Sequence, residues 1–215
     1  MLASICLVPF NNTQYFFRVM TQLLSTDFIR YETIVIDNST NPIHRILIWA
    51  ICKMYKSRLN VRHFRGLNKS LSSATNRAAT IATSKYLVYL CSNHTWIYDN
   101  GWLRYMVGEM EKNQADIGGT ISMAVRPHVQ GGLFIVKTMT LLSIPFNEKQ
   151  FPMSFMDVEL AQRFEYRKKK FLHLSKVFSI MGRLNLDIHA EWTKTKDVVI
   201  CHSHLFGDPK WKECK

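Results

Sequence analysis

TIVIDNST, residues 33–40, is a run of branched apolar side chains that ends in an acid and a polar turn. A run of the same form, SICLVPFNN, precedes it at residues 4–12, and a third, YLVYLCSNH, follows at residues 86–94. Short apolar runs bounded by turn residues are typical of strands that are buried on both faces. The three runs therefore predict three core strands, and each strand ends in polar side chains.

Segments with helical spacing separate these strands. The first carries its apolar residues on one helix face, namely Phe16, Val19, Met20, Leu23 and Leu24. The second begins at Pro42, which suits the first position of a helix. Its predicted inward face holds Ile43, Ile46, Leu47, Ala50, Ile51 and Met54. With a further strand at residues 60–64 and a helix at residues 70–83, the alternation predicts an α/β fold with a parallel sheet.

The second half of the chain is less regular. It predicts a helix from Asp99 to Lys112, strands at residues 120–125 and 133–136, and a helix at residues 157–170. Glu159 and Arg163 stand four residues apart and are predicted to pair on the outside of the last helix. No linker marks a domain boundary, so a single domain over residues 1–215 is predicted.

In open sheets of this kind, ligands bind beyond the carboxyl ends of the parallel strands. Three turns occupy that position here, at residues 9–12, 37–40 and 91–94. Asp37 could simply cap its own turn, as aspartate often does, but its place at the predicted sheet edge favours a contact with a ligand. The three turns together form the predicted binding site.

The charge balance predicts an anionic partner. The chain has 28 Lys and Arg against 16 Asp and Glu, a formal net charge of +12, and residues 38–98 contain no acid. Nucleic acid, a lipid surface and a phosphorylated ligand all fit such a charge. No apolar run approaches the roughly 20 residues that span a bilayer, and the apolar residues 1–10 lack the basic start of a signal peptide.

Five cysteines, an odd number without CxxC spacing, indicate free thiols in a reducing compartment. We therefore expect a cytoplasmic protein. The basic run at residues 167–170 is either a solvated helix end or a patch for a phosphorylated or membrane-borne acceptor. If this run is such a patch, we also expect the protein to contact an anionic membrane surface peripherally.

The order of these motifs resembles the nucleotide-sugar half of family 2 glycosyltransferases with the GT-A fold. LVPFNN, TIVIDNST and RHFRGLNKSLSSATNRAATIATSKYLVYLCSNHTW carry the resemblance, which covers residues 4–102. It extends more loosely through Gly131-Gly132 and residues 156–159 to the C-terminal histidines. The resemblance implies a GT-A (Rossmann-like) mixed sheet, mostly parallel and flanked by helices. Residues 1–102 would form the nucleotide-sugar half, and residues 103–215 the acceptor half and C-terminal tail.

The resemblance also implies roles for single residues. Asp157 matches the general base that deprotonates the acceptor hydroxyl in inverting members, with a helix cap as the alternative. Asp37 would bind the base or ribose of a nucleotide-diphosphate sugar. Further contacts to the donor are expected from Pro9, Phe10, Asn11, Asn38, Arg65, Lys69, Arg77, Cys91, Ser92 and Asn93.

The Asp-x-Asp position of the family, where a carboxylate binds Mn²⁺ or Mg²⁺, reads Cys91-Ser92-Asn93 here. Hard cations prefer oxygen ligands, and a thiol is a soft ligand. Three alternatives stay open: a weak metal site of Asn93, His94 and His202, basic side chains in place of the metal, or loss of catalysis. His204 alternates with His202 along an extended segment and is a further candidate ligand.

The first hypothesis is therefore an inverting glycosyltransferase that transfers a hexosyl or related sugar to the hydroxyl of a glycan, lipid-linked or protein acceptor. Arg65, Lys69 or Arg77 is predicted to replace the metal in part at the diphosphate. The second hypothesis is a nucleotide-sugar-binding module of the same fold without catalysis. The third is a transferase or binder that acts on nucleic acid, and it ranks last because the sequence shows no helix-turn-helix, zinc-finger or RNA-binding signature.

Overall fold

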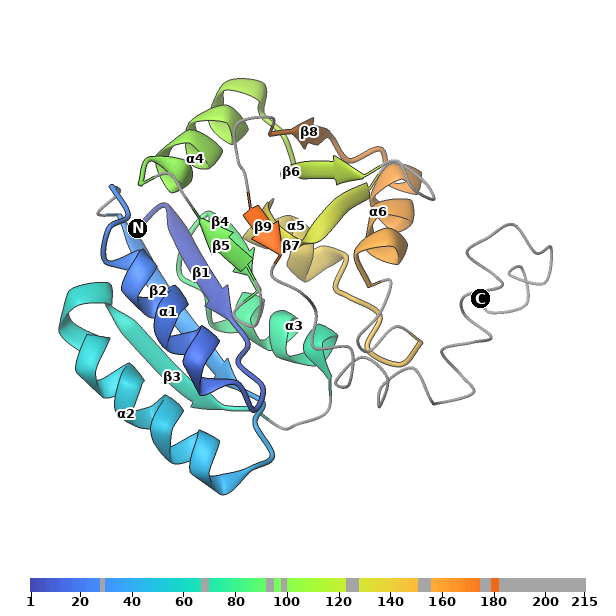
Figure 1. The fold of residues 1–215 in the computed structure, drawn as a ribbon. Coiled ribbons are helices and arrows are strands. Elements are labelled where there is room, and N and C mark those ends of the chain that lie inside the picture. The colour runs from blue at the N-terminus through green and yellow to red at the C-terminus, as the bar shows by residue number, and fades with distance from the viewer. Residues whose placement is uncertain are drawn as a thin grey trace.

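The computed structural model describes residues 1–27, 30–66, 70–91, 95–97, 100–122, 128–150, 156–174 and 179–181 (Figure 1). Its strands are β1 (Ala3–Leu7), β2 (Tyr31–Asp37), β3 (Val61–Arg65), β4 (Tyr86–Leu90), β5 (Thr95–Ile97), β6 (Ile117–Ser122), β7 (His128–Lys137), β8 (Phe171–His173) and β9 (Ser179–Met181). Its helices are α1 (Thr13–Leu23), α2 (Pro42–Leu59), α3 (Leu71–Ile81), α4 (Trp102–Asn113), α5 (Thr138–Ser143) and α6 (Met156–Tyr166). The predicted alternation of strands and helices is confirmed as far as β4.

One sheet of seven strands has the order β3-β2-β1-β4-β7-β6-β8, and β5 pairs with β9 apart from it. Parallel pairs join β1 to β2 and β4, β2 to β3, and β6 to β8, whereas β7 runs antiparallel to β4 and β6. The sheet is thus mixed and mostly parallel, as predicted. Since β1 lies between β2 and β4, the three predicted core strands end side by side.

Helices cover both faces of this sheet, with α1, α2 and α4 on one face and α3, α5 and α6 on the other (Figure 1). Successive side chains of a strand point to opposite faces. Ile5 and Leu7 of β1 therefore pack under the first layer, while Cys6 and Val8 pack under the second. Burial on both faces explains why the strands read as continuous apolar runs.

Polar residues at the strand ends also start the helices. Side-chain oxygens of Asn12, Asn41 and Ser70 accept hydrogen bonds from backbone N–H groups in the first turns of α1, α2 and α3. Such caps satisfy donors that have no partner within the helix. Pro42 stands at the first turn of α2, as predicted, where its missing N–H costs nothing.

One prediction is wrong, namely the inward face of α2. The residues that α2 buries are Ile48, Ile51, Cys52, Tyr55 and Leu59. Of the predicted inward set only Ile51 is buried, whereas Ile43 and Ile46 are each 66% exposed. Two apolar stripes with the same helical spacing run along this helix, so periodicity alone cannot choose which one packs on the sheet.

Element bounds in the second half also differ from those predicted. β6 is Ile117–Ser122, so Gly118 lies within the strand and not before it. A Cβ atom at Gly118 would lie 2.9 Å from Sδ of Met110 and 3.2 Å from Cδ1 of Leu174. Glycine therefore lets α4 pack closely on this strand. Helix α6 ends at Tyr166, four residues before its predicted end.

Three of the five cysteines lie in the described ranges, and Cys6, Cys52 and Cys91 are all buried free thiols. Burial raises the pKa of Cys52 to about 12 and the pKa of Cys6 still further. Thiols of such high pKa are poor nucleophiles, so these two have a packing role. Within the part of the chain that the structure describes, no helix has both the length and the apolar character to cross a membrane.

Candidate functional site

Two of the three predicted turns meet through hydrogen bonds at the carboxyl ends of β1 and β2. Asn11, with φ of 45°, places its side chain between them. Its Oδ1 accepts from the backbone N–H groups of Thr40 and Asn41, each at 3.0 Å, and its backbone N–H donates to Oγ of Ser39 at 3.0 Å. The backbone N–H of Asn38 donates to the carbonyl of Pro9 at 3.0 Å. Asn11 therefore fixes the turns to each other.

Asp37 lies at the base of this edge and is 3% exposed. Its Oδ1 accepts a hydrogen bond from the backbone N–H of Ser39 at 2.9 Å. Asp37 therefore caps its own turn, which was the alternative to a contact with a ligand. The same residue lines a cavity of about 400 Å³ together with Arg45, Ile46, Trp49, His63 and Arg65. Asp37 thus both caps its turn and borders an open cavity.

Gly66 is a residue that the sequence analysis missed. Its backbone N–H donates to the carbonyl of Asp37 at 2.7 Å. A Cβ atom at this position would lie 2.0 Å from Oδ1 of Asn38 and 2.7 Å from the carbonyl oxygen of Asp37. Only glycine allows β3 to end so close to β2, and the signal in the sequence was a lone glycine after a strand.

His63 is a second missed residue, and it lies on the face of β3 that borders the Asp37 cavity. Its Nε2 is buried and has no hydrogen-bond partner within the described structure. Burial lowers the pKa of the His63 imidazole, and the negative charge of Asp37 opposes this in part. The imidazole is therefore mostly neutral at pH 7.

Arg65 and Arg77, both predicted to bind the donor, meet at the end of β3. Nη1 of Arg77 donates to the backbone carbonyl of Arg65 at 2.6 Å, and its guanidinium lies 5.9 Å from the centre of the Phe64 ring. Arg77 therefore anchors the end of β3 to α3. The exposed Arg65 borders the cavity beside Asp37.

The beginning of α6 brings Asp157 to the same end of the sheet. Oγ of Ser72, near the start of α3, donates to Sδ of Met156 at 3.4 Å. Burial raises the pKa of Tyr89 well above its ordinary value, and Cys91, Cys6 and, to the smallest extent, the charge of Asp157 raise it further. Asp157 is therefore close to the last residues of β4, although it comes from a helix far along the chain. Its Oδ1 also accepts from the N–H of Val158 at 2.9 Å, so it has a capping contact too.

Cys91 directly follows β4, at the position that the resemblance matches to the first carboxylate of the Asp-x-Asp motif. It is 8% exposed, and its backbone N–H donates to the carbonyl of Gly132 at 2.9 Å. A thiol suits Mn²⁺ and Mg²⁺ poorly. Among the described residues there is also no group of three or more His, Cys, Asp or Glu that could hold a metal ion. Lys69, Ser92, Asn93, His94 and His202 lie outside the described residues, so their roles stay predictions.

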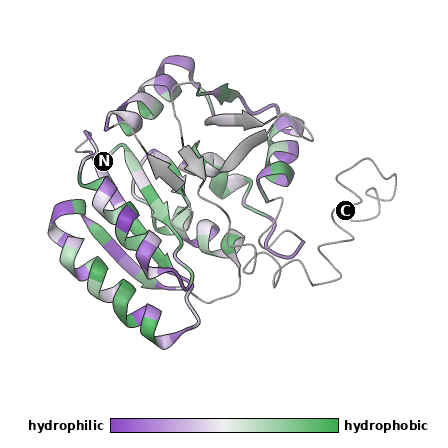
Figure 2. Cartoon of the chain, in the orientation of Figure 1, coloured by the Kyte–Doolittle hydropathy of each residue, from purple (hydrophilic) through white to green (hydrophobic). Residues whose placement is uncertain are grey.

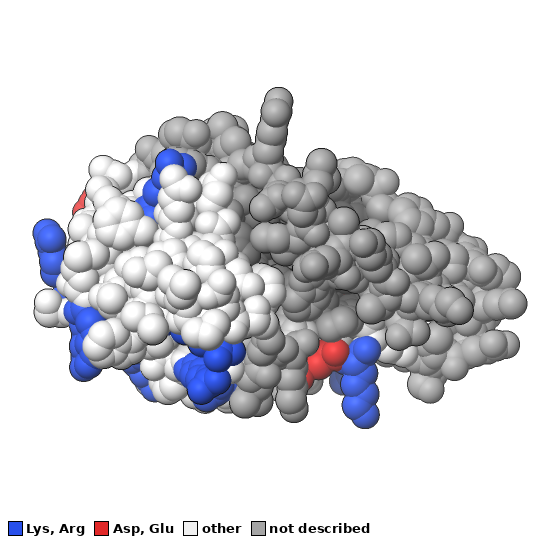
Figure 3. Space-filling view, turned by 60° about the horizontal axis from the view of Figure 1, so that its bottom comes forward, with Lys and Arg blue, Asp and Glu red and all other residues white. Residues whose placement is uncertain are grey.

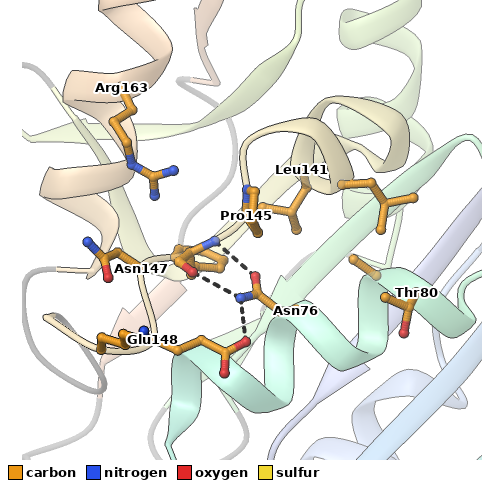
Figure 4. Close-up of a pocket in the computed structure, with 11 residues that line it drawn as sticks. Asn76, Thr80, Leu141, Pro145, Asn147, Glu148 and Arg163 are labelled. Atoms are coloured by element: carbon orange, nitrogen blue, oxygen red, sulfur yellow. Dashed lines mark hydrogen bonds between the residues drawn. The ribbon is translucent and has the colours of Figure 1, made fainter.

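A second cavity, of about 620 Å³, lies between α3 and the segment that joins α5 to α6 (Figure 4). Asn76 points into this segment: its Nδ2 donates to the carbonyl of Phe146 and to Glu148, and its Oδ1 accepts from the N–H of Phe146. Arg163 borders the cavity from α6 and pairs with Glu159 at 2.5 Å. This pair was predicted, but Glu159 is only 5% exposed and not on the outside.

The fold and the polar edge of β1, β2 and β4 define the class of protein. The chain belongs to glycosyl transferase family 2, whose family profile matches residues 4–156. The match begins at the second residue of β1, covers β2 to β7 in full and ends one residue before Asp157. No curated protein matches the chain significantly.

Solved structures share the GT-A fold at low sequence identity. The mannosyltransferase PcManGT from Pyrobaculum calidifontis, in complex with GDP-Man and Mn²⁺, superposes with a TM-score of 0.75 at 13% identity, over 88% of this chain and 59% of that one. S. aureus TarS with UDP-GlcNAc gives 0.64 at 17% identity, over 82% of this chain and 56% of that one. Glucosyl-3-phosphoglycerate synthase from Mycobacterium tuberculosis, with Mn²⁺, UDP and phosphoglyceric acid, gives a TM-score of 0.68 at 14% identity, over 97% of this chain and 79% of that one. The chain thus spans less than two thirds of the first two proteins.

Proposed function

We propose that this protein is a glycosyltransferase that takes a sugar from a nucleotide-diphosphate sugar and transfers it, with inversion, to an acceptor hydroxyl. The observation that carries the proposal is the family match, which spans the edge where the β1 and β2 turns are joined beside Asp37. The GDP-Man and UDP-GlcNAc bound by the two structures above support a nucleotide sugar as the donor. A glycan, a lipid-linked molecule or a protein is the proposed acceptor.

In this proposal Asp157 acts as the general base. Its carboxylate takes the proton of the acceptor hydroxyl, whose oxygen attacks the anomeric carbon. The new glycosidic C–O bond forms as the bond to the diphosphate oxygen breaks, and the nucleoside diphosphate leaves. Two observations support this role: the neighbouring Met156 contacts Ser72 of α3, and the charge of Asp157 acts on Tyr89 of β4.

The departing diphosphate needs positive charge. Mn²⁺ is present in two of the related structures. Cys91 is a poor ligand for it, so the proposed mechanism does not depend on a metal ion. We propose instead that Arg65 and Arg77, with Lys69, supply charge at the end of β3. Arg65 supports this best, because it is exposed and borders the Asp37 cavity.

The test is release of nucleoside diphosphate from a panel of UDP- and GDP-sugars, with and without manganese. Asp157→Asn should lower turnover by about 10²–10⁴-fold with little change in nucleotide affinity, since it removes a base and not a binding contact. Glu111→Gln, an exposed carboxylate on α4 paired with Lys85, is the matched control and should leave turnover unchanged. Turnover that survives Asp157→Asn would refute the assigned base. Absence of both turnover and nucleotide binding would refute the proposed function.

A binding module without catalysis is the second candidate, and the thiol of Cys91 in the place of a carboxylate favours it. Calorimetry separates the two proposals. Nucleotide binding without turnover, unchanged by Asp157→Asn, would support the module. Arg65→Glu should weaken nucleotide binding under either proposal, because both place the diphosphate near this cation.

A further inference from the structure

The outer face of α2 is rich in exposed apolar side chains, and three of them, Ile43, Leu47 and Met54, do not border the Asp37 cavity of the proposed donor site. Five of the large apolar side chains that are exposed in the described structure lie on this one helix, namely Ile43, Ile46, Leu47, Trp49 and Met54. They are between 44% and 66% exposed. Figure 2 shows apolar residues along α2, and Figure 1 places the helix at the outer edge of its layer.

The apolar residues form a continuous stripe on the outside of the helix. With about 100° per residue, Ile43, Ile46, Leu47 and Met54 fall on one side, opposite the buried stripe that includes Ile48. The helix is therefore apolar on two opposite sides. A single apolar side is enough to hold it on the sheet, so the outer one is available to a partner.

Cations border the outer stripe. Lys53, Lys56 and Arg58 are exposed, and Nζ of Lys53 lies 5.6 Å from the centre of the Trp49 ring. Neither α2 nor the neighbouring strand β3 contains an acidic residue. Figure 3, which brings the lower edge of the molecule forward, shows Lys and Arg around an uncharged area, with acidic side chains only at its margins. A partner of this face must be both apolar and anionic.

We propose that the outer face of α2 docks on an anionic membrane surface, with Ile43, Leu47 and Met54 among the acyl chains and the flanking cations at the headgroups. Interfacial helices combine an apolar stripe with Lys and Arg in this way. A second copy of the chain fits the face less well, because the two sets of cations would face each other without acids to pair with them.

Co-sedimentation of the full chain with lipid vesicles tests this proposal. The protein should bind vesicles of phosphatidylcholine with phosphatidylglycerol, bind pure phosphatidylcholine much more weakly, and dissociate as salt rises. Ile43→Ser/Met54→Ser should weaken binding by at least about tenfold, because four or more buried methylene equivalents are lost. Lys53→Gln/Lys56→Gln should weaken binding by about tenfold or more.

Matched controls are available on the opposite side of the sheet. Met139→Ser/Leu142→Ser changes two exposed apolar residues of α5, and Lys149→Gln changes an exposed cation nearby. Neither should alter vesicle binding. Circular dichroism should show that all variants are folded, because every substituted side chain is exposed.

Lack of binding to anionic vesicles, or binding that the α2 variants leave intact, would overturn the proposal. A dimer in analytical ultracentrifugation that Ile43→Ser/Met54→Ser dissociates, without vesicle binding, would assign the face to a second copy and also overturn the proposal. These outcomes are independent of donor turnover, so they do not bear on the proposed function.

Discussion

Glu32→Gln tests the network that the buried carboxylate of Glu32 holds together near the amino ends of β1, β2 and β3. Glu32 is 1% exposed and accepts four hydrogen bonds. Oε1 receives them from Oγ of Ser4 at 2.7 Å and from the backbone N–H and the hydroxyl of Thr83 at 2.9 and 2.8 Å. Oε2 receives one from Nη1 of Arg62 at 2.9 Å. The carboxylate thereby joins β1, β2, β3 and the end of α3.

The magnitude follows from what glutamine keeps and loses. Its amide oxygen can still accept from Ser4 and Thr83, but as a neutral group, and its NH₂ would face Arg62. Bonds to a charged group contribute about 1.5–3 kcal/mol and neutral ones about 0.5–1.5 kcal/mol. Removal of one partner of a buried ion pair costs about 3–5 kcal/mol, but Arg62 is 37% exposed and can regain water. We therefore expect the free energy of unfolding to fall by about 2–3 kcal/mol.

The matched control is Glu111→Gln. Glu111 also pairs with a cation, Lys85, at 2.8 Å, but the two side chains are 45% and 50% exposed. An exposed pair of this kind contributes less than about 1 kcal/mol. Urea denaturation followed by circular dichroism at pH 7 should thus separate the two variants clearly. If the two variants lost equal amounts of stability, burial would not be the reason that the Glu32 carboxylate stabilises the fold.

The pH dependence gives a second check on Glu32. Burial alone would raise the pKa of its carboxyl, but the hydrogen bonds from Thr83, Ser4 and Arg62 outweigh it and hold the pKa below its usual value. The stabilising effect is therefore complete above the unfolded-state pKa of about 4.3 and is lost as the pH falls through the folded pKa. The difference in the free energy of unfolding between the wild type and Glu32→Gln should therefore become smaller in acid. A gap that stays constant down to low pH would contradict the lowered pKa.

Three further predictions concern the site and its supports. Asn11→Ala should lower the free energy of unfolding by about 1–2 kcal/mol, because alanine at φ of 45° is strained and the two turns lose their link; Asn11→Gly, which removes the strain, should lose less. Asn76→Asp should destabilise by about 1–3 kcal/mol at pH 7 in thermal denaturation, because it replaces a donor by a charge next to Glu148, and Asn76→Ser, without that charge, should be milder. His63, whose pKa is lowered, should make unfolding easier as the pH falls below the unfolded value of about 6.5; a His63→Asn variant with the same slope of stability against pH would rule this out.

Local pattern was enough to predict much of this fold. Strands that are buried on both faces must be apolar at every position, so β1, β2 and β4 stand out in the sequence with their polar ends. Their alternation with helices implied parallel neighbours, and this in turn placed the turns around Asn11 and Asp37 together. The hydrogen bonds between these turns confirm that placement.

Features that depend on distant partners could not be predicted. Asn76 belongs to a motif that the sequence placed near the nucleotide, but its hydrogen bonds go to Phe146 and Glu148, about a third of the chain away. The burial of Glu32 and the narrow space at Gly66 likewise result from contacts between separate strands. The pattern of residues within one segment carries no information on contacts with segments far away in the sequence.

Helix α2 shows most clearly which features the local sequence determines and which the tertiary structure determines. The sequence by itself determined that residues 42–59 form a helix, because Pro42, the Asn41 cap and the apolar spacing all act within a few residues. It could not determine which of two equivalent stripes is buried. Only the packing on the sheet beside Phe16 and Val61 made that choice, because burial depends on the shape of the surface that receives the helix. The stripe that remains outside is the one that we propose to face a membrane.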